Sequence, residues 1–209
     1  MNKAVQVDHS HYDFSSYMLK GRWSSTWHQI DEVMKFKPQS VLEVGPGLGI
    51  FKAIASKLKI AITSVDFDPS LEPDITASIT DLPVSDDQFD VACAFQVLEH
   101  LPYDQALEGF RELARVATRG IVISLPDSQI AWRYRFQIPK LGAYDFLVPR
   151  PVLRRRPAVF DGQHYWEINK RGYELKKVVR DLEEVATLVR TFRVPELPYH
   201  RFLAFEARQ

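Results

Sequence analysis

The stretch Val41-Leu42-Glu43-Val44-Gly45-Pro46-Gly47-Leu48-Gly49-Ile50-Phe51 decides the fold of this chain. A short apolar run leads into three glycines at alternate positions, and apolar residues then recur at helical spacing: Ile50, Phe51, Ile54 and Leu58. Glycine allows the backbone to turn at positive φ and to approach a ligand closely. A strand, a glycine turn and a helix in this order predict an α/β domain that binds a nucleotide-like ligand at the start of the helix.

The spacing of the glycines separates two classes of nucleotide site. Dinucleotide-binding turns read Gly-x-Gly-x-x-Gly, whereas this turn reads Gly45-x-Gly47-x-Gly49. The acidic Glu43 precedes the turn, where its carboxylate could meet a ligand's ammonium group directly or through water. The pattern resembles the first motif of the class I S-adenosylmethionine (SAM)-dependent methyltransferases, acidic-x-Gly-x-Gly-x-Gly. A dinucleotide oxidoreductase is the alternative, and the spacing argues against it.

Later segments agree with this resemblance in order and in distance. A β-rich run, 61–65, ends at Asp66, and the resemblance implies that this carboxylate binds the ribose hydroxyls of SAM. It also implies that Asp81, beyond a short strand predicted over 74–79, meets the adenine amino group with Leu82 against the ring. Residues 89–101 end in Val-Leu-Glu-His-Leu and resemble the fourth-strand motif of the type 11 methyltransferase subgroup.

The pattern of apolar segments predicts a doubly wound α/β fold. The resemblance implies a Rossmann-like seven-stranded sheet in the order 3-2-1-4-5-7-6, with an inserted cap after strand five. A helix is predicted over 24–36, with Ser24 or Ser25 as N-cap and Trp27 among its inward-facing residues. A last helix, 173–182, and two antiparallel strands, 185–193 and 199–207, complete the prediction.

The chain divides into an N-terminal lid and helix, 1–37, and a SAM-binding domain, 38–209, with its cap at 127–165. Tyr17, Arg22 and Trp23 are the expected lid contacts. With 209 residues the chain is long enough for one good core. No apolar run of about 18 residues and no signal-peptide pattern occurs, so we expect a cytoplasmic location. The single cysteine, Cys93, predicts no internal disulfide, and no Cys/His spacing suggests a metal.

Charge is unevenly distributed although the net charge is zero. Residues 60–110 contain eleven acids and no Lys or Arg, around the expected site of a cationic sulfonium. Residues 131–156 contain seven bases and one acid, within an insertion rich in aromatic residues and proline. This composition suggests an anionic or amphiphilic acceptor, such as a phosphorylated sugar, a lipid-linked saccharide or an acidic aromatic. A protein contact, a peripheral membrane contact or a solvated loop would have the same composition.

Methyl transfer needs positioning above all, and an oxygen nucleophile also benefits from a general base. His100 and His164 are the candidate catalytic residues, and a purely structural role for His100 is the alternative. Gln96 follows the fourth strand at the same sheet edge and is a candidate cofactor contact. Methyl transfer to oxygen or nitrogen of a small-molecule or lipid-linked acceptor is therefore the predicted function.

Two other functions share these motifs. A nucleic-acid methyltransferase would use the basic insertion on a phosphate backbone, but the zero net charge and the lack of a second basic segment argue against nucleic acid as a partner. Phe95-Gln96-Val97-Leu98 stands where base-amino methyltransferases carry an Asn-Pro-Pro-Tyr-like motif. A non-catalytic SAM-binding partner subunit stays open, as does the oligomeric state.

Overall fold

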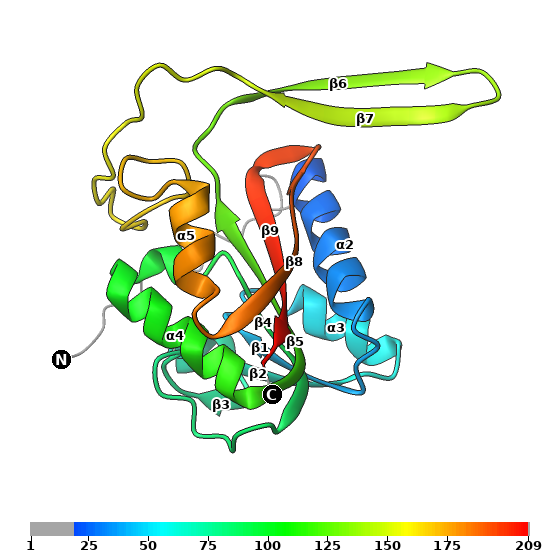
Figure 1. The fold of residues 1–209 in the computed structure, drawn as a ribbon. Coiled ribbons are helices and arrows are strands. Elements are labelled where there is room, and N and C mark those ends of the chain that lie inside the picture. Colours follow the sequence, from blue (N-terminus) through cyan, green and yellow to red (C-terminus); the bar gives the residue numbers. More distant parts are fainter. Residues whose placement is uncertain (1–18, 209) are drawn as a thin grey trace.

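The computed structural model of this chain describes residues 19–208, whose central element is a seven-stranded sheet (Figure 1). Its strands are β1 (Ser40–Val44), β2 (Ala61–Asp66), β3 (Ile75–Thr76), β4 (Phe89–Phe95), β5 (Ala117–Pro126), β8 (Ala186–Val194) and β9 (Leu197–Ala207). They lie in the order β3-β2-β1-β4-β5-β9-β8. The strand order predicted from the sequence is thereby confirmed, because β9 and β8 are the seventh and sixth strands of the sheet.

Strand direction brings the functional segments to one edge of the sheet. The first five strands pair in parallel, as in Val41↔Val91 between β1 and β4. Strand β9 runs antiparallel to β5, from Gly120↔Glu206 to Pro126↔His200. The beginning of β9 therefore lies at the same edge as the carboxyl ends of the parallel strands, where open α/β sheets bind their ligands.

Helices cover both faces of the sheet (Figure 1). They are α2 (Lys20–Met34), α3 (Ile50–Lys57), α4 (Tyr103–Val116) and α5 (Leu175–Leu182), with 3-10 turns η2 (Pro69–Leu71) and η3 (Leu98–His100). Alternate strand residues supply two cores: Leu42 and Ile121 pack with α4 and α5, whereas Val41 and Val122 pack with α2 and α3. The rigid sheet buried on both faces fixes the loops that follow its strands.

The first described helix differs from its prediction. Helix α2 begins at Lys20, and its N-cap residue Leu19 makes no side-chain cap. Neither predicted cap serves that role, because the Ser24 hydroxyl donates to the carbonyl of Lys20 and Ser25 bonds His200. Trp27, predicted to face inward, is 60% exposed. None of the helices within residues 19–208 combines the length and the apolar character needed to cross a membrane.

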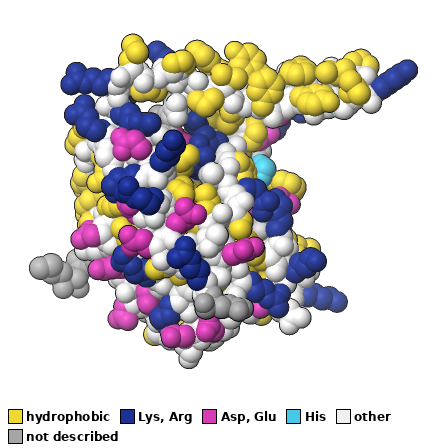
Figure 2. Space-filling view, in the orientation of Figure 1, with side chains coloured by type: hydrophobic (Ala, Val, Ile, Leu, Met, Phe, Trp, Pro, Cys, Tyr) yellow, Lys and Arg dark blue, Asp and Glu magenta, His cyan; other side chains and the backbone are white. Residues whose placement is uncertain are grey.

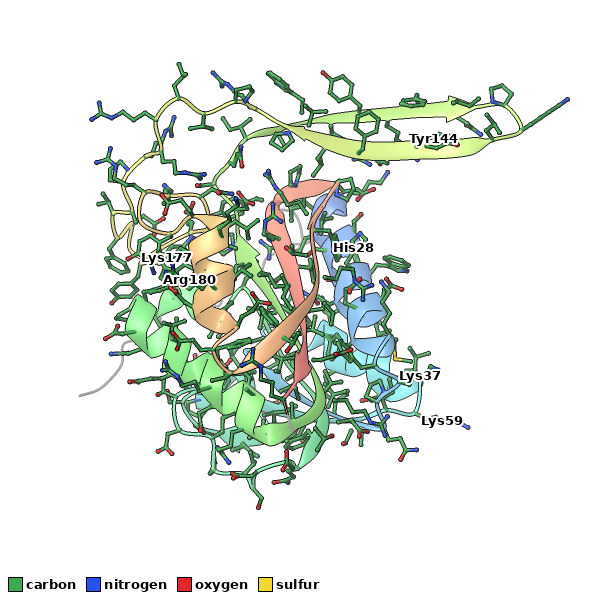
Figure 3. All side chains as sticks on the ribbon, in the orientation of Figure 1. His28, Lys37, Lys59, Tyr144, Lys177 and Arg180 are labelled. Carbon is green, nitrogen blue, oxygen red and sulfur yellow. The ribbon has the colours of Figure 1, made fainter. Side chains whose placement is uncertain are left out.

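The insertion after β5 is more regular than the sequence suggested. Strands β6 (Ala131–Ile138) and β7 (Gly142–Pro149) form a separate antiparallel hairpin that extends from the body of the domain (Figure 1). Figure 3 shows Tyr144 of the hairpin at one end of the molecule and Lys37 and Lys59, which precede β1 and β2, at the other. The hairpin therefore lies on the side of the sheet to which its parallel strands point.

Candidate active site

A cavity of about 900 Å³ opens at the carboxyl edge of the sheet. Its lining comes from the loops after β1, β2, β3 and β4, from helix α2, and from the start of β9. Residues 160 and 162–165 of the insertion also line it, whereas the hairpin does not. The predicted cap over the acceptor is therefore limited to the returning segment, because the pairing of β6 with β7 carries the aromatic residues 132–146 away from the cavity. The volume suits a small-molecule or cofactor site.

The glycine turn forms one wall of this cavity. Gly45, Gly47 and Gly49 have φ of 72°, 51° and 67°, in the left-handed region that favours glycine. A Cβ on Gly45 would lie 2.4 Å from Cγ2 of Val97, in the loop after β4. Gly45 and Gly47 line the cavity, while Gly49 is the N-cap of α3 and lies outside the lining. The turn thus needs glycine for its backbone conformation and, at Gly45, for packing as well.

Glu43 supplies a buried acceptor beneath the glycine turn. Its residue is 3% exposed and lines the cavity, and Oε2 accepts no hydrogen bond from the part of the chain that the structure describes. Burial raises the pKa of its carboxyl to about 8, against the opposing effect of Lys52. A buried acceptor of this kind is costly unless a ligand supplies the donor. It fits the ammonium group of a ligand.

Asp66 ends β2 and lines the cavity beside the glycine turn. Its residue is 7% exposed, and Oδ1 accepts a 2.9 Å hydrogen bond from the backbone N–H of Asp68, which holds the carboxylate in place. Burial raises the pKa of this carboxyl, and the Asp68 N–H opposes that effect. A fixed carboxylate at the tip of the second strand can accept hydrogen bonds from a ribose diol. Phe67 and Asp68 also line the cavity, although the sequence analysis assigned them no role.

The structure corrects the two residues predicted to meet the adenine. Asp81 is exposed and lies outside the cavity lining, and Leu82 is buried in the core with α4. The reason is the short β3, which is followed by a turn closed by the hydrogen bond from Asp81 N–H to the carbonyl of Ser78. That turn presents residues 77–79 to the cavity in place of the predicted pair. The segment that lines the cavity after β3 therefore begins a few residues earlier than the sequence predicted.

The other end of the cavity contains the two predicted histidines. His100 in η3 donates from Nδ1 to the carbonyl oxygen of Gln163, 3.0 Å away, and burial lowers its pKa. The rings of His100 and His164 lie 5.0 Å apart, centroid to centroid. Gln96 also lines this region, with φ of 58° and a 3.2 Å hydrogen bond from Nε2 to the Ser124 hydroxyl. The structure therefore brings His164 to Gln96 and His100, which lie much earlier in the sequence.

His164 belongs to a hydrogen-bonded group whose member Tyr199 lies too far away in the sequence for the group to be recognised there. Its Nδ1 lies 3.5 Å from Oε1 of Glu167 and 3.3 Å from the hydroxyl of Tyr199. Glu167 raises the pKa of His164, and His164 in turn lowers the pKa of Glu167. Burial and this carboxylate raise the pKa of Tyr199. Glu167 and Tyr199 stand in His-Tyr-Trp-Glu and Pro-Tyr-His-Arg, segments whose contact depends on the tertiary fold.

Glu99 is the least compensated group in this region. It is fully buried, and neither carboxylate oxygen accepts a hydrogen bond from a described residue. Burial raises its pKa to about 8. The possible ligand atoms of Glu99, His100 and His164 lie within 4.8 Å of one another, as do those of Asp161, His164 and Glu167. These two overlapping sets are the described residues that could hold a metal ion, although the sequence predicted none.

Helix α2 covers part of the cavity with Arg22, Ser25, Thr26 and Gln29. The Ser25 hydroxyl lies 2.8 Å from Nδ1 of His200, and burial together with Arg22 lowers the pKa of His200 to about 3. Of the other predicted lid contacts, Trp23 is 44% exposed and outside the lining, and Tyr17 lies outside the described residues. The position of α2 agrees with a covering role for this part of the chain.

Residues 42–124 match the family model of a methyltransferase domain, which spans the sheet from β1 to β5. This match to a methyltransferase domain agrees with the resemblance to the class I SAM-dependent methyltransferases. No curated protein matches this methyltransferase significantly in sequence. The matched region contains the glycine turn, Glu43 and Asp66. These residues suit SAM, the cofactor of the family, because Oε2 of Glu43 accepts no hydrogen bond from a described residue and the glycine turn lines the cavity beside it.

Solved structures with this fold extend over nearly the whole methyltransferase. A 1,6-didemethyltoxoflavin-N1-methyltransferase from Burkholderia thailandensis has a TM-score of 0.61 at 16% identity, covering 96% of this chain and 84% of its own. Magnesium protoporphyrin IX methyltransferase from Synechocystis has a TM-score of 0.58 at 16% identity, covering 98% and 86%. An N-methyltransferase from Bradyrhizobium japonicum has a TM-score of 0.61 at 11% identity, covering 98% and 95%. At these identities the likeness is one of fold.

Proposed function

We propose that this methyltransferase transfers the methyl group of SAM to an oxygen or nitrogen atom of a small-molecule or lipid-linked acceptor. The observation that carries the proposal is the group formed by His164, Glu167 and Tyr199, since His164 and Tyr199 line the same cavity as Glu43 and Asp66. The strand order separates two ends of the cavity. Glu43 and Asp66 belong to β1 and β2 at one end, and the histidines lie toward β4, β5 and β9 at the other. Cofactor and acceptor would therefore meet near Gln96.

In this proposal one end of the cavity holds SAM with two carboxylates and with the backbone of the glycine turn. Glu43 meets its ammonium group, Asp66 its ribose hydroxyls, and the glycine turn at 45–49 accommodates the rest at close approach. Gln96, which lines the cavity, is a further contact of the cofactor in this proposal. SAM supplies a methyl group on a sulfonium leaving group, so the chain contributes mainly alignment, which is worth up to about 7–11 kcal/mol.

His164 takes the proton of the acceptor. Its Nδ1 faces Glu167 and Tyr199, so Nε2 is the nitrogen that would receive a proton from an acceptor hydroxyl or amine. The Glu167 carboxylate stabilises the resulting imidazolium. His100, the second candidate base, donates from Nδ1 to Gln163 and has a lowered pKa, so it stays neutral at pH 7 and orders the segment that bears His164.

The acceptor class rests on two supports. Structural neighbours methylate didemethyltoxoflavin, magnesium protoporphyrin IX and a glycopeptide, according to their names, and none of these is a nucleic acid. The cavity end near His164 carries Phe160 and Tyr165, whose rings lie 4.4 Å apart and would pack against an apolar or aromatic part of an acceptor. A cytoplasmic location, residues 1–37 as an N-terminal lid and helix, and residues 38–209 as the SAM-binding domain complete the proposal; positions 1–18 of the first segment lie outside the described residues.

Thermal shifts followed by methyl-transfer assays test it. SAM and S-adenosylhomocysteine should stabilise the protein by about 2.7 kcal/mol at 100 times their dissociation constants, and NADH and ATP should not. Labelled SAM with pooled metabolites or lipid extract should then give a methylated product, with kcat reduced roughly 10²–10⁴-fold in His164→Gln. Stabilisation by NADH alone, or label incorporated only into DNA or RNA, would contradict the proposal.

A further inference from the structure

The β6–β7 hairpin has two chemically different faces. Because side chains alternate along a strand, one face is entirely apolar or aromatic and the other carries the charges. The first, which we call the aromatic face, consists of Trp132, Tyr134, Phe136, Ile138, Tyr144, Phe146 and Val148. Cross-strand partners stack upon it, with ring centroids 5.7 Å apart for Tyr134 and Phe146 and 5.5 Å apart for Phe136 and Tyr144.

The aromatic face is turned away from the body of the domain. On the opposite face, Arg133 forms a salt bridge with Asp145 and contacts Glu196, in the turn between β8 and β9, at 2.9 Å. That contact directs the charged face toward the sheet, so the rings point outward. Figure 2 shows the resulting band of hydrophobic side chains along the hairpin.

The outward surface is large, and within residues 19–208 nothing covers it. Phe136, Phe146 and Trp132 are 46%, 45% and 49% exposed, and Leu141 at the tip is 69% exposed. Ile130, Val152, Leu153 and Val159, before and after the hairpin in the insertion, are also exposed. A two-stranded hairpin is marginally stable in water by itself, and exposed apolar patches of this kind mark interaction sites.

Unpaired cations surround this apolar surface. Within residues 128–160 the only acid is Asp145, which Arg133 already pairs. Arg135 lies opposite the same Asp145, and four further basic residues form no salt bridge with a described acid: Lys140, Arg150, Arg154 and Arg156. The insertion therefore offers positive charge at the tip of the hairpin and just beyond its base.

We propose that the β6–β7 hairpin binds the surface of a lipid bilayer that contains anionic lipids, with the aromatic face inserted among the headgroups. Trp and Tyr rings favour this boundary, aliphatic tips such as Leu141 enter it, and Lys and Arg pair with anionic headgroups. A second copy of the chain would bring like charges together, and single-stranded nucleic acid would leave the aliphatic residues unused. Binding of the hairpin to a bilayer depends on these surface residues and is independent of which acceptor the enzyme methylates.

Co-sedimentation with vesicles is the direct test. The full chain should bind vesicles of phosphatidylcholine and phosphatidylglycerol and bind phosphatidylcholine alone much more weakly. The double variant Phe136→Ser/Tyr144→Ser should lose binding by roughly tenfold or more, because it removes one stacked ring pair from the apolar surface. Arg154→Gln/Arg156→Gln should lose about fivefold per charge. Tryptophan emission should shift to the blue with anionic vesicles in the wild-type protein but not in Trp132→Phe.

Trp27→Ser is the matched control, because this exposed aromatic residue lies on α2 and is not part of the aromatic face. It should bind vesicles like the wild type, and all variants should keep their thermal shift with S-adenosylhomocysteine, which shows that they are folded. Absence of binding to anionic vesicles would overturn the proposal. So would a dimer in light scattering that the hairpin variants dissociate, or tight binding to RNA in place of vesicles.

Discussion

The Tyr199 hydroxyl donates a 3.0 Å hydrogen bond to Oε1 of Glu167 and thereby joins the start of β9 to the segment that returns from the insertion. The same carboxylate faces His164 and raises its pKa. The carboxylate that raises the pKa of His164 is therefore itself held by a residue that is far away in the sequence.

Glu167→Gln should lower the pKa of His164, because the carboxylate that favours the imidazolium is removed. A general base works in its neutral form, so activity rises as pH increases through the pKa of His164. The rising limb of kcat/KM against pH should move to lower pH, and the plateau should fall because the imidazolium is less stabilised. Tyr199→Phe keeps the carboxylate and should shift the limb less. A limb that stays in place in Glu167→Gln would exclude His164 as the titrating base.

Asp66→Ala should weaken binding of S-adenosylhomocysteine by at least one to two orders of magnitude while the protein stays folded. The loss corresponds to charge-assisted hydrogen bonds of about 1.5–3 kcal/mol each. Isothermal titration calorimetry measures it, and Asp81→Ala is the matched control, since that carboxylate is exposed outside the cavity. Equal losses in both variants would reinstate Asp81 as a cofactor residue.

Gly45→Ala should cost more stability than Gly49→Ala. Both residues have positive φ, which costs a non-glycine residue roughly 1–2 kcal/mol. Only at Gly45 would the new Cβ also overlap a side chain, that of Val97, because nothing lies within 4 Å of the corresponding position at Gly49. Thermal unfolding should show a drop of about 2–8 °C for Gly49→Ala and a larger one for Gly45→Ala. Equal drops would mean that Val97 moves aside at no cost.

Binding of SAM should release protons near neutral pH through Glu43. Burial raises its pKa from 4.5 to about 8, so the ligand-free protein holds this carboxyl protonated, and its contribution to stability is full below pH 4.5 and lost as pH rises through about 8. An ammonium group at Oε2 would favour the ionised form, and binding would then expel the proton. Calorimetry in buffers of different ionisation enthalpy should detect this release at pH 6–7. It should vanish in Glu43→Gln and persist in Glu99→Gln.

Chelation distinguishes a base at His164 from a metal ligand at the same position. If His164 accepts the proton, EDTA should leave kcat unchanged, and added Zn²⁺ should inhibit by occupying the cluster with Glu99 and His100. Activity that EDTA abolishes and a divalent ion restores would assign this cluster to a metal instead. Steady-state rates with and without the chelator are sufficient for the decision.

The sheet and its ligand edge could be predicted from the sequence because their signals are local. The glycine turn, the β-rich run that ends at Asp66 and the alternation of apolar residues each lie within a few consecutive residues. Asp81 was misplaced because a strand of two residues leaves no periodicity by which to count the turn that follows it.

The acceptor end could be predicted only in part. Both histidines were recognised by residue type, but the partners of His164 come from β9 and from the returning segment, and no local pattern brings these together. The hairpin was not predicted because prolines stand close to its aromatic and basic residues. A segment with this composition can also be an irregular loop. The strict alternation of residues 132–138 was the signal that could have revealed a strand with two different faces, and the register between β6 and β7 adds the second strand to each face.

The base of the hairpin has a consequence for how this enzyme can change. The N–H of Arg150 donates to the carbonyl of Ile130 at 2.9 Å, and Ala131 pairs with Pro149, so the chain leaves and re-enters the domain at almost one point. Because the two ends of the insert already lie together, closing a loop between them costs little entropy. A different insert between these positions would therefore change the stability of the seven-stranded sheet very little. The β6–β7 hairpin can therefore be exchanged as a unit. Such an exchange would let the same catalytic domain bind a different surface while its chemistry stays the same.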